Sequence, residues 1–341
     1  MSKQPTLSVL MCNYNHAQFL PEALDAIVSQ LFKSFEVIVC DDGSTDNSVE
    51  IIQRFVRRYT FVRLVRNNTN LGIFASLDKL MAIASGDYLY GAAADDRILP
   101  GFFEKSMKLL LQYPQAGLCS ARTLCIDAQG RNRGILHAPV IIGKGGFVSS
   151  DKALSMLYRQ GSWMQGNTVI FRKRALINSG GFIPELYSFS DGFIHQVIAV
   201  KYGVCFIPEP LTAWRQLDSS YSVTIAKDSV TSLQWIHYAK KLMLTTYHDL
   251  FSSDFVDCWE KRELINFHLL RYYNLQNDAL QDLERLNLTR SLTGRCLFGF
   301  RKLLAKIDYF ILKFYLYRRA KLFANQLIIQ KMKSFWVTIL K

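Results

Sequence analysis

Short apolar runs alternate with helix-patterned segments along the first hundred residues. Runs of strand length occupy residues 7–12, 35–40, 61–65 and 88–92. Between them, apolar positions recur at three- and four-residue steps, which is the period of an amphipathic helix. Parallel strands need a long crossover connection, usually a helix. The alternation therefore predicts an α/β fold, with a Rossmann-like, mostly parallel sheet flanked by helices on both faces.

The pattern changes twice further along the chain. Residues 101–224 still mix strand-like and helix-like runs, but in a less regular order. From residue 225 the chain is rich in Leu, Tyr and Lys and contains no proline, which favours helices. We therefore expect a domain over 1–224, divided into halves 1–100 and 101–224, and a helical C-terminal region over 225–341.

Charge is concentrated at the C-terminal end of the chain. The 341 residues are 50% hydrophobic and 20% charged, a balance that is typical of a globular protein and excludes a disordered chain. Of the formal net charge of +13, residues 286–341 contribute twelve basic side chains against one acidic side chain. Such an excess favours anionic partners, namely nucleotide phosphates, nucleic acid or acidic lipid.

Cysteine usage and hydropathy indicate the compartment. The seven cysteines are an odd number without a CxxC pair, which argues against a zinc site or a disulfide framework and fits a reducing cytoplasm. The first residues do not have the pattern of a signal peptide, and no uninterrupted apolar run is long enough to span a bilayer. We expect a cytoplasmic protein.

Polar residues follow three of the predicted strands where these strands end. Tyr14 follows the first strand, Asp41 and Asp42 the second, and Asp95 and Asp96 the fourth. Ligands of parallel sheets bind at the carboxyl ends of the strands. A tyrosine ring can stack on a base, and adjacent carboxylates can hold Mg²⁺ or Mn²⁺ against a diphosphate. Taken alone, the Asp41-Asp42 motif is equally typical of a capped turn, and Tyr14 and Asp95-Asp96 are more typical of a packed aromatic ring and a solvated pair. Together they predict a nucleotide diphosphate site with a metal.

Four segments carry a resemblance to a known family. SVLMCNYN, SFEVIVCDDGSTDNS, NLGIFASLDKLMAIASGDYLYGAAADD and GGFIPELYSFSDGF resemble, in the same order, the motifs of the family 2 inverting glycosyltransferases with the GT-A fold. The resemblance covers about residues 6–222. It implies an enzyme that transfers a sugar from a nucleotide diphosphate sugar, with a UDP-sugar as the expected donor and a hydroxyl of a bacterial glycan or lipid-linked molecule as the expected acceptor.

The resemblance also implies roles for the residues of the nucleotide site. Cys12 and Tyr14 would border the base, Asp42 would meet the imino N–H of the base, and Asp41 would order the loop. Asp95 would lie near the ribose and the metal. The metal, Mg²⁺ or Mn²⁺, would have Asp96 as its main protein ligand.

The remaining candidates lie in the second half of the matched region. Asp191 matches the family's general base, although without the resemblance the same residue would be interpreted as a helix N-cap. Arg215 remains as a diphosphate contact, while Leu217 stands where the family has a histidine. Trp163 and His195 are candidates for acceptor contacts, and packing in the core is the alternative for both.

Two other classes of protein fit part of the pattern. A nucleotide-sugar pyrophosphorylase would need a Gly-rich loop with an arginine after the first strand, where this chain has Asn13–His16. A basic nucleic-acid-binding or scaffold protein fits the net charge, but the acidic strand ends would repel a polyanion. We therefore expect no nucleic-acid partner.

The basic tail has the pattern of amphipathic helices. Apolar and basic residues interleave at three- and four-residue steps between residues 301 and 335. This pattern predicts peripheral binding of residues 286–341 to an anionic membrane surface at the inner face of the cell membrane. A helical hairpin packed on the catalytic domain, or a contact in a homo-oligomer, would have the same pattern.

Overall fold

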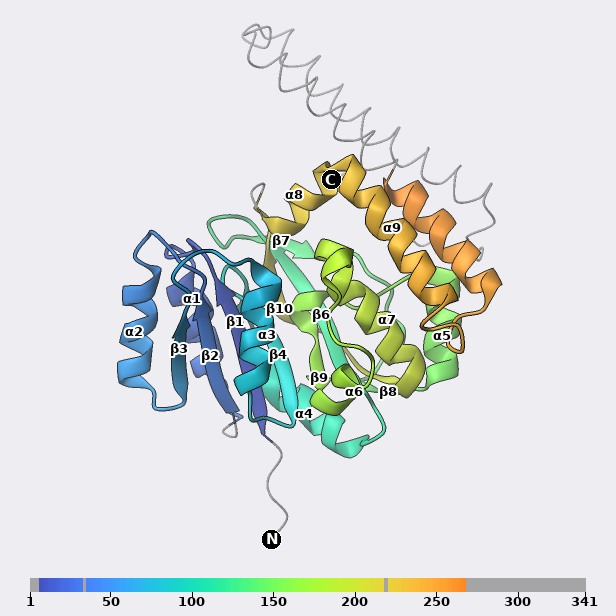
Figure 1. The fold of residues 1–341 in the computed structure, drawn as a ribbon. Coiled ribbons are helices and arrows are strands. Elements are labelled where there is room, and N and C mark those ends of the chain that lie inside the picture. The colour runs from blue at the N-terminus through green and yellow to red at the C-terminus, as the bar shows by residue number, and fades with distance from the viewer. Residues whose placement is uncertain (1–5, 33–34, 218–219, 268–341) are drawn as a thin grey trace, which may run out of the picture. The chain divides into compact units, whose positions relative to one another are not determined.

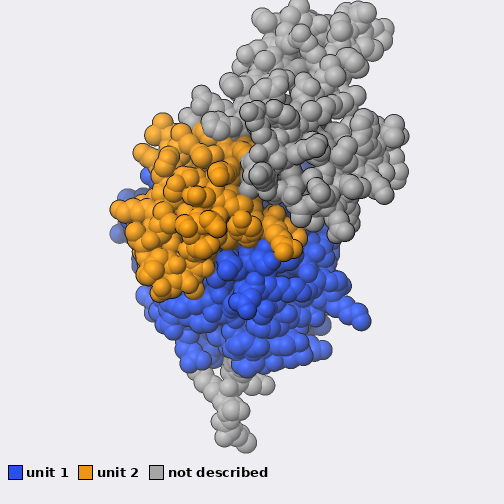
Figure 2. Space-filling view, turned by 90° about the vertical axis from the view of Figure 1, so that its right-hand side faces the viewer, with its two compact units in different colours: residues 1–157, 162–223 blue, residues 158–161, 224–341 orange. Residues whose placement is uncertain are grey.

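The computed structural model describes residues 6–32, 35–217 and 220–267, which belong to two compact units. One unit comprises residues 1–157 and 162–223, and the other comprises residues 158–161 and 224–341 (Figure 2). The segment 286–341, for which we predict membrane binding, lies outside the described residues.

The first unit begins with the predicted alternation of strands and helices (Figure 1). Its elements are β1 (Leu7–Asn13), α1 (Leu20–Val28), β2 (Phe35–Asp41), α2 (Ser48–Arg58), β3 (Val62–Arg66), α3 (Ile73–Ile83) and β4 (Tyr88–Ala93). The four apolar runs therefore form the four predicted strands.

The elements that follow vary more in length and order. They are β5 (Arg97–Ile98), α4 (Phe102–Gln112), β6 (Leu118–Ile126), β7 (Asn132–Ile135), β8 (Gly146–Val148), α5 (Ser150–Gln160), the 3₁₀ turn η1 (Gly166–Thr168), β9 (Ile170–Arg172), α6 (Lys173–Ile177), the 3₁₀ segment η2 (Pro184–Phe189), α7 (Ser190–Tyr202), β10 (Val204–Arg215) and α8 (Tyr221–Lys227). The sequence pattern did not predict β10.

The strands form one sheet in the order β3-β2-β1-β4-β9-β6-β10-β5, with β7 beside β6 and β8 beside β10. β1 pairs in parallel with β2 and β4, and β6 pairs in parallel with β10. β9 is antiparallel to both β4 and β6, so the two parallel halves run in the same direction. The mostly parallel sheet is confirmed, and the carboxyl ends of β1, β2, β4, β6 and β10 lie along one edge.

Apolar side chains are buried on both faces of this sheet. One face carries Val9, Val39 and Tyr90, which pack in a single core with Leu24 of α1 and Phe103 of α4. Figure 1 shows α3 and α7 over the other face. Burial on both faces explains why the parallel strands are continuous apolar runs rather than alternating ones.

The second unit is helical in its described part. The Asp228 side chain accepts a hydrogen bond from Val230 N at 3.0 Å and so caps α9 (Ser229–Leu244). Arg262 Nη2 donates to the Tyr158 carbonyl at 2.5 Å, which joins residues 158–161 to this unit. Among the helices that the structure describes, none has the length and apolar character needed to cross a membrane.

Candidate active site

The loops after β1 and β2 are joined by side-chain hydrogen bonds. Asn13 Nδ2 donates to Asp41 Oδ2 at 2.9 Å, and Asp41 Oδ1 accepts from Ser44 N at 3.1 Å. Asn15, which has a φ of 56°, accepts from Thr45 N at 2.8 Å through its Oδ1 atom. Asp41 is fully buried. Its contacts are those expected of a residue that orders the loop.

Asp42 is buried at the end of β2 and binds the loop that precedes α3. Its Oδ1 accepts from Asn67 Nδ2 at 2.7 Å and Leu71 N at 2.9 Å, and its Oδ2 accepts from Gly72 N at 2.9 Å. Burial raises the pKa of this carboxyl, but these hydrogen bonds outweigh burial and hold the pKa below its ordinary value. Asp42 is therefore an anion, with acceptor capacity left on Oδ2.

Cys12 and Tyr14 lie at the end of β1, beside Asp42 in the sheet order. Burial, followed by the neighbouring Cys40 and Asp42, raises the pKa of the Cys12 thiol, so that it stays protonated. Tyr14 is 43% exposed, which leaves its ring available to a ligand. Both positions are compatible with the expected border of a base.

Asp96 follows β4 and is held by two donors from distant parts of the chain. Asn167 Nδ2 donates to Asp96 Oδ2 at 3.0 Å, and Arg215 N donates to Asp96 Oδ1 at 2.8 Å. Burial, followed by the charge of Asp95, raises the pKa of Asp96 to about 7 in spite of these bonds. Two adjacent carboxylates in this position favour a cation.

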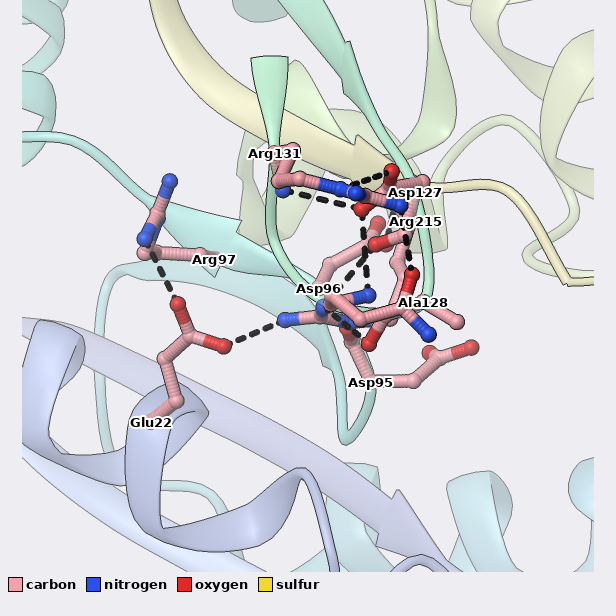
Figure 3. A network of polar contacts seen from close by, with 9 residues as sticks. Glu22, Asp95, Asp96, Arg97, Asp127, Ala128, Arg131 and Arg215 are labelled. Carbon is pink, nitrogen blue, oxygen red and sulfur yellow. Dashed lines mark hydrogen bonds and ion pairs between the residues drawn. The ribbon is translucent and has the colours of Figure 1, made fainter. Parts of the chain in front are cut away.

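Arg215 corrects one expectation from the sequence. Its side chain is 2% exposed, and its guanidinium donates to the carbonyls of Asp95 at 2.8 Å and of Asp127 and Ala128 at 3.1 Å, and to Glu22 (Figure 3). Because these protein acceptors already bind the guanidinium, Arg215 is not a diphosphate contact. It fastens the Asp95-Asp96 turn to α1 and to the hairpin after β6.

Asp191 is the second residue of α7. Its Oδ1 accepts from Gly192 N at 2.6 Å, and its Oδ2 faces Gly166, where an added Cβ would lie 2.1 Å away. Burial raises the pKa of the Asp191 carboxyl to about 6, partly offset by the backbone N–H groups of Gly192 and Asp191. The helix-terminal position and a carboxyl suited to general base chemistry coexist at this residue.

Trp163 and His195 are buried, which corrects the expectation that they contact the acceptor. Each is 1% exposed. The His195 ring packs 5.3 Å from the Phe171 ring, and burial lowers its pKa to about 3, so it is a neutral core residue. Neither ring is accessible to an acceptor in this arrangement.

The sequence profile described as Glycosyl transferase family 2 matches residues 8–178, which is half of the chain. The chain belongs to this family. EpsE of Bacillus subtilis strain 168 is 33% identical to this glycosyltransferase over 150 residues, which are 42% of the chain and 54% of EpsE. The chain thus matches about half of the length of that relative.

Solved structures share the fold of this glycosyltransferase. TarS of S. aureus superimposes with a TM-score of 0.57 at 15% identity, over 89% of this chain and 54% of that one. The mannosyltransferase PcManGT of Pyrobaculum calidifontis, in complex with GDP-Man and Mn²⁺, gives 0.53 at 16% identity over 90% and 88%. These likenesses establish the GT-A fold.

The residues at the end of β4 fit a divalent cation. Within the part of the chain that the structure describes, no group of three His, Cys, Asp or Glu side chains could hold a metal by itself. Mg²⁺ sites in proteins commonly use one or two carboxylates together with substrate phosphates and water. Each Asp96 oxygen has one of the two bonds above and retains a lone pair, so Asp95 and Asp96 suit such a site.

Sequence reasoning missed three residues that hold the site together. Asn67 binds Asp42, Glu22 binds Arg215, and Asn167 binds Asp96. Each pair is separated by at least 25 residues. Because such contacts arise from strand order rather than from local pattern, no periodicity or spacing in the sequence could have shown them.

Proposed function

We propose that this glycosyltransferase inverts the anomeric centre when it moves a sugar from a UDP-sugar to a hydroxyl of a glycan or lipid-linked acceptor, with Asp191 as the general base. The observation that carries the proposal is the Asp191 carboxyl, whose pKa burial raises to about 6, next to the η1 turn that also binds Asp96. One short turn thus contacts both carboxylates that the reaction would use.

A general base is needed because a sugar hydroxyl is almost fully protonated at neutral pH. In an inverting transfer the acceptor oxygen attacks the anomeric carbon from the face opposite the leaving diphosphate, and its proton passes to a carboxylate. A carboxylate with a raised pKa accepts this proton more readily than an ordinary aspartate. Asp191 would accept it on the oxygen that Gly192 N does not bind.

Asp95 and Asp96 would hold the metal at the diphosphate. A bound Mg²⁺ or Mn²⁺ would neutralise the charge of the leaving diphosphate. Asn167 and the Arg215 backbone orient Asp96, and Arg215 fixes the turn through the Asp95 carbonyl. The structures of TarS with UDP and with UDP-GlcNAc, and of PcManGT with GDP-Man and Mn²⁺, support a nucleotide sugar as the donor and a divalent metal.

We expect nucleotide binding to depend on the metal. Without a cation, the diphosphate would face the Asp95 and Asp96 carboxylates directly and be repelled. Calorimetric titration of UDP should show binding with Mn²⁺, at least tenfold weaker binding with EDTA, and a similar loss in Asp96→Ala. Asp25→Ala, which removes an exposed carboxylate on α1, is the control and should bind as wild type. Equal UDP affinity with Mn²⁺ and with EDTA would refute the metal site.

The same calorimetric titration tests which nucleobase the donor carries. Asp42 Oδ2 retains acceptor capacity for an imino N–H, and the Tyr14 ring is exposed for stacking. We expect UDP to bind more tightly than GDP. Tighter binding of GDP would contradict the assignment of a uridine donor.

We further propose that residues 286–341 bind an anionic membrane surface, which would confine the enzyme to the surface that holds a lipid-linked acceptor. The support is the charge of this segment, which has twelve basic residues and one acidic residue. The full chain should sediment with anionic vesicles at low salt, and high salt should release it. A chain that stays in the supernatant at low salt would leave packing or homo-oligomerisation as the role of the segment.

A further inference from the structure

The η1 turn lies between the two carboxylates of the proposed reaction. On one side, Gly166 faces Asp191, and a Cβ built at Gly166 would lie 2.1 Å from Asp191 Oδ2 and 3.4 Å from Asp191 Cγ. Since no real Cβ approaches an oxygen so closely, any side chain at residue 166 would displace the carboxylate. The close approach therefore requires a glycine here.

On the other side of the same turn, Asn167 binds the carboxylate at the end of β4. Asn167 Nδ2 donates to Asp96 Oδ2 at 3.0 Å and makes a longer contact of 3.4 Å with Thr123 Oγ1 of β6. The position of Asn167 is itself fixed, because its carbonyl accepts from the Tyr90 hydroxyl of β4 at 3.0 Å. Asn167 thus joins β4, β6 and the Asp95-Asp96 turn.

We propose that Gly166 and Asn167 are positioning residues that together set the spacing between the acceptor-activating carboxylate of Asp191 and the diphosphate-binding carboxylate of Asp96. The inference rests on the proposed function. In an in-line displacement the attacking and leaving oxygens lie on opposite sides of one carbon, so the groups that act on them must keep a fixed separation. Two consecutive residues of one turn provide that separation with few free torsions between the two contacts.

The two contacts have separable consequences. Without the Asn167 amide, Asp96 Oδ2 loses its hydrogen-bond donor and only Oδ1 stays bound, by Arg215 N. This loss should weaken metal-dependent binding of the nucleotide. A methyl group at Gly166 pushes on Asp191 alone, so it should affect the chemical step and leave nucleotide binding intact. A purely structural turn would show neither pattern, because both substitutions would then change stability and all activities together.

The first arm of the experiment uses UDP with Mn²⁺ as the probe of Asn167. Asn167→Ala should weaken Mn²⁺-dependent UDP binding by about 10- to 100-fold, the range found for residues that orient metal ligands. Thr123→Val is the matched control, because it leaves the Asn167–Asp96 hydrogen bond in place. It should bind UDP with Mn²⁺ within about twofold of wild type, well below the loss expected for Asn167→Ala. Wild-type affinity in Asn167→Ala would overturn the assignment of Asn167.

The second arm uses the kinetics of Gly166→Ala. We expect kcat to fall about 100-fold, while the donor KM and the UDP–Mn²⁺ affinity stay within about twofold, since a misplacement of about 1 Å can cost this much. Gly143→Ala is the control, because Gly143 has open space around its Cα. An unchanged kcat in Gly166→Ala, or a loss of UDP affinity as large as the loss of kcat, would overturn the assignment of Gly166.

Melting temperatures of Gly166→Ala in two backgrounds test the contact with Asp191 even if this variant folds poorly. If Asp191 is the obstacle, Gly166→Ala should lower Tm in the wild-type background and have no such effect in Asp191→Ala. An equal drop in both backgrounds would overturn the proposed contact. If the wild-type protein binds no UDP with Mn²⁺, the proposed function fails and this inference fails with it, whereas wild-type binding with unaffected variants overturns the inference alone.

Discussion

Replacing Asp191 by asparagine should lower kcat for sugar transfer by about 10²- to 10⁴-fold, the usual contribution of a general base. Asparagine has nearly the same shape and can still accept the hydrogen bond from Gly192 N through its amide oxygen. It cannot accept the proton of the acceptor hydroxyl. The measurement is the steady-state rate of transfer with a UDP-sugar donor and the acceptor that the wild-type enzyme uses.

The pH profile distinguishes a base from a residue that only shapes the site. Burial raises the pKa of Asp191 to about 6, so the reactive carboxylate is the form present above that pH. At saturating Mn²⁺ and donor, where the metal keeps Asp96 ionised, the wild-type kcat should rise about tenfold per pH unit below 6 and level off above it. Asp191→Asn should lose this rise and keep Mn²⁺-dependent UDP binding. Wild-type turnover in this variant would refute the assignment of Asp191.

Replacing Arg215 by methionine should lower the free energy of unfolding of the first unit by about 3 to 5 kcal/mol, because loss of the buried guanidinium leaves three backbone carbonyls without a donor and each such loss costs about 1 to 3 kcal/mol. The guanidinium donates to the carbonyls of Asp95, Asp127 and Ala128 and to the Glu22 carboxylate. Methionine fills much of the volume but leaves these acceptors without their donors. Urea unfolding followed by circular dichroism measures the difference.

Arg131→Met is the matched control for this substitution. Arg131 also pairs with a carboxylate, Asp127, at 2.8 Å, but its side chain is 69% exposed. Exposed ion pairs contribute about 0 to 1 kcal/mol, so we expect a loss below about 1 kcal/mol. If the two variants unfold at the same urea concentration, Arg215 does not stabilise the Asp95-Asp96 turn in the way that its contacts indicate.

The N-terminal half of the fold could be predicted from local pattern. The apolar runs that became β1, β2 and β4 have buried residues on both faces, and that burial is the reason they are continuous in the sequence, whereas the edge strand β3 is partly exposed. The acidic residues after β2 and β4 could be placed at one sheet edge, because parallel strands end on the same side. These predictions needed only the period of each segment and the order of the segments.

The longest strand could not be predicted in this way. β10 contains Pro208 and Pro210, and proline in a segment argues against a central strand because it has no N–H for the ladder. The pairing of β10 with β6 tolerates them through shifts of register on both sides of Pro210. These irregularities are tertiary adjustments that the strand pattern alone does not show.

The roles of individual side chains depended on their surroundings. Arg215, Trp163 and His195 are residue types that bind ligands on a surface, but all three are buried. Burial depends on which elements pack over a residue, and that is decided by strand order and helix placement. Local pattern therefore could not separate a ligand contact from a core residue at these positions.

The sequence by itself determined the family resemblance, the α/β alternation and the carboxylates at the strand ends, because each of these features depends only on residues that are close together in the sequence. Only the tertiary structure decided that η1 contacts both Asp96 and Asp191, and that Arg215 holds the Asp95-Asp96 turn from a residue 120 positions away. The physical reason is that a sheet joins segments by strand order. Contacts between its loops then follow from that order and leave no signal in local spacing.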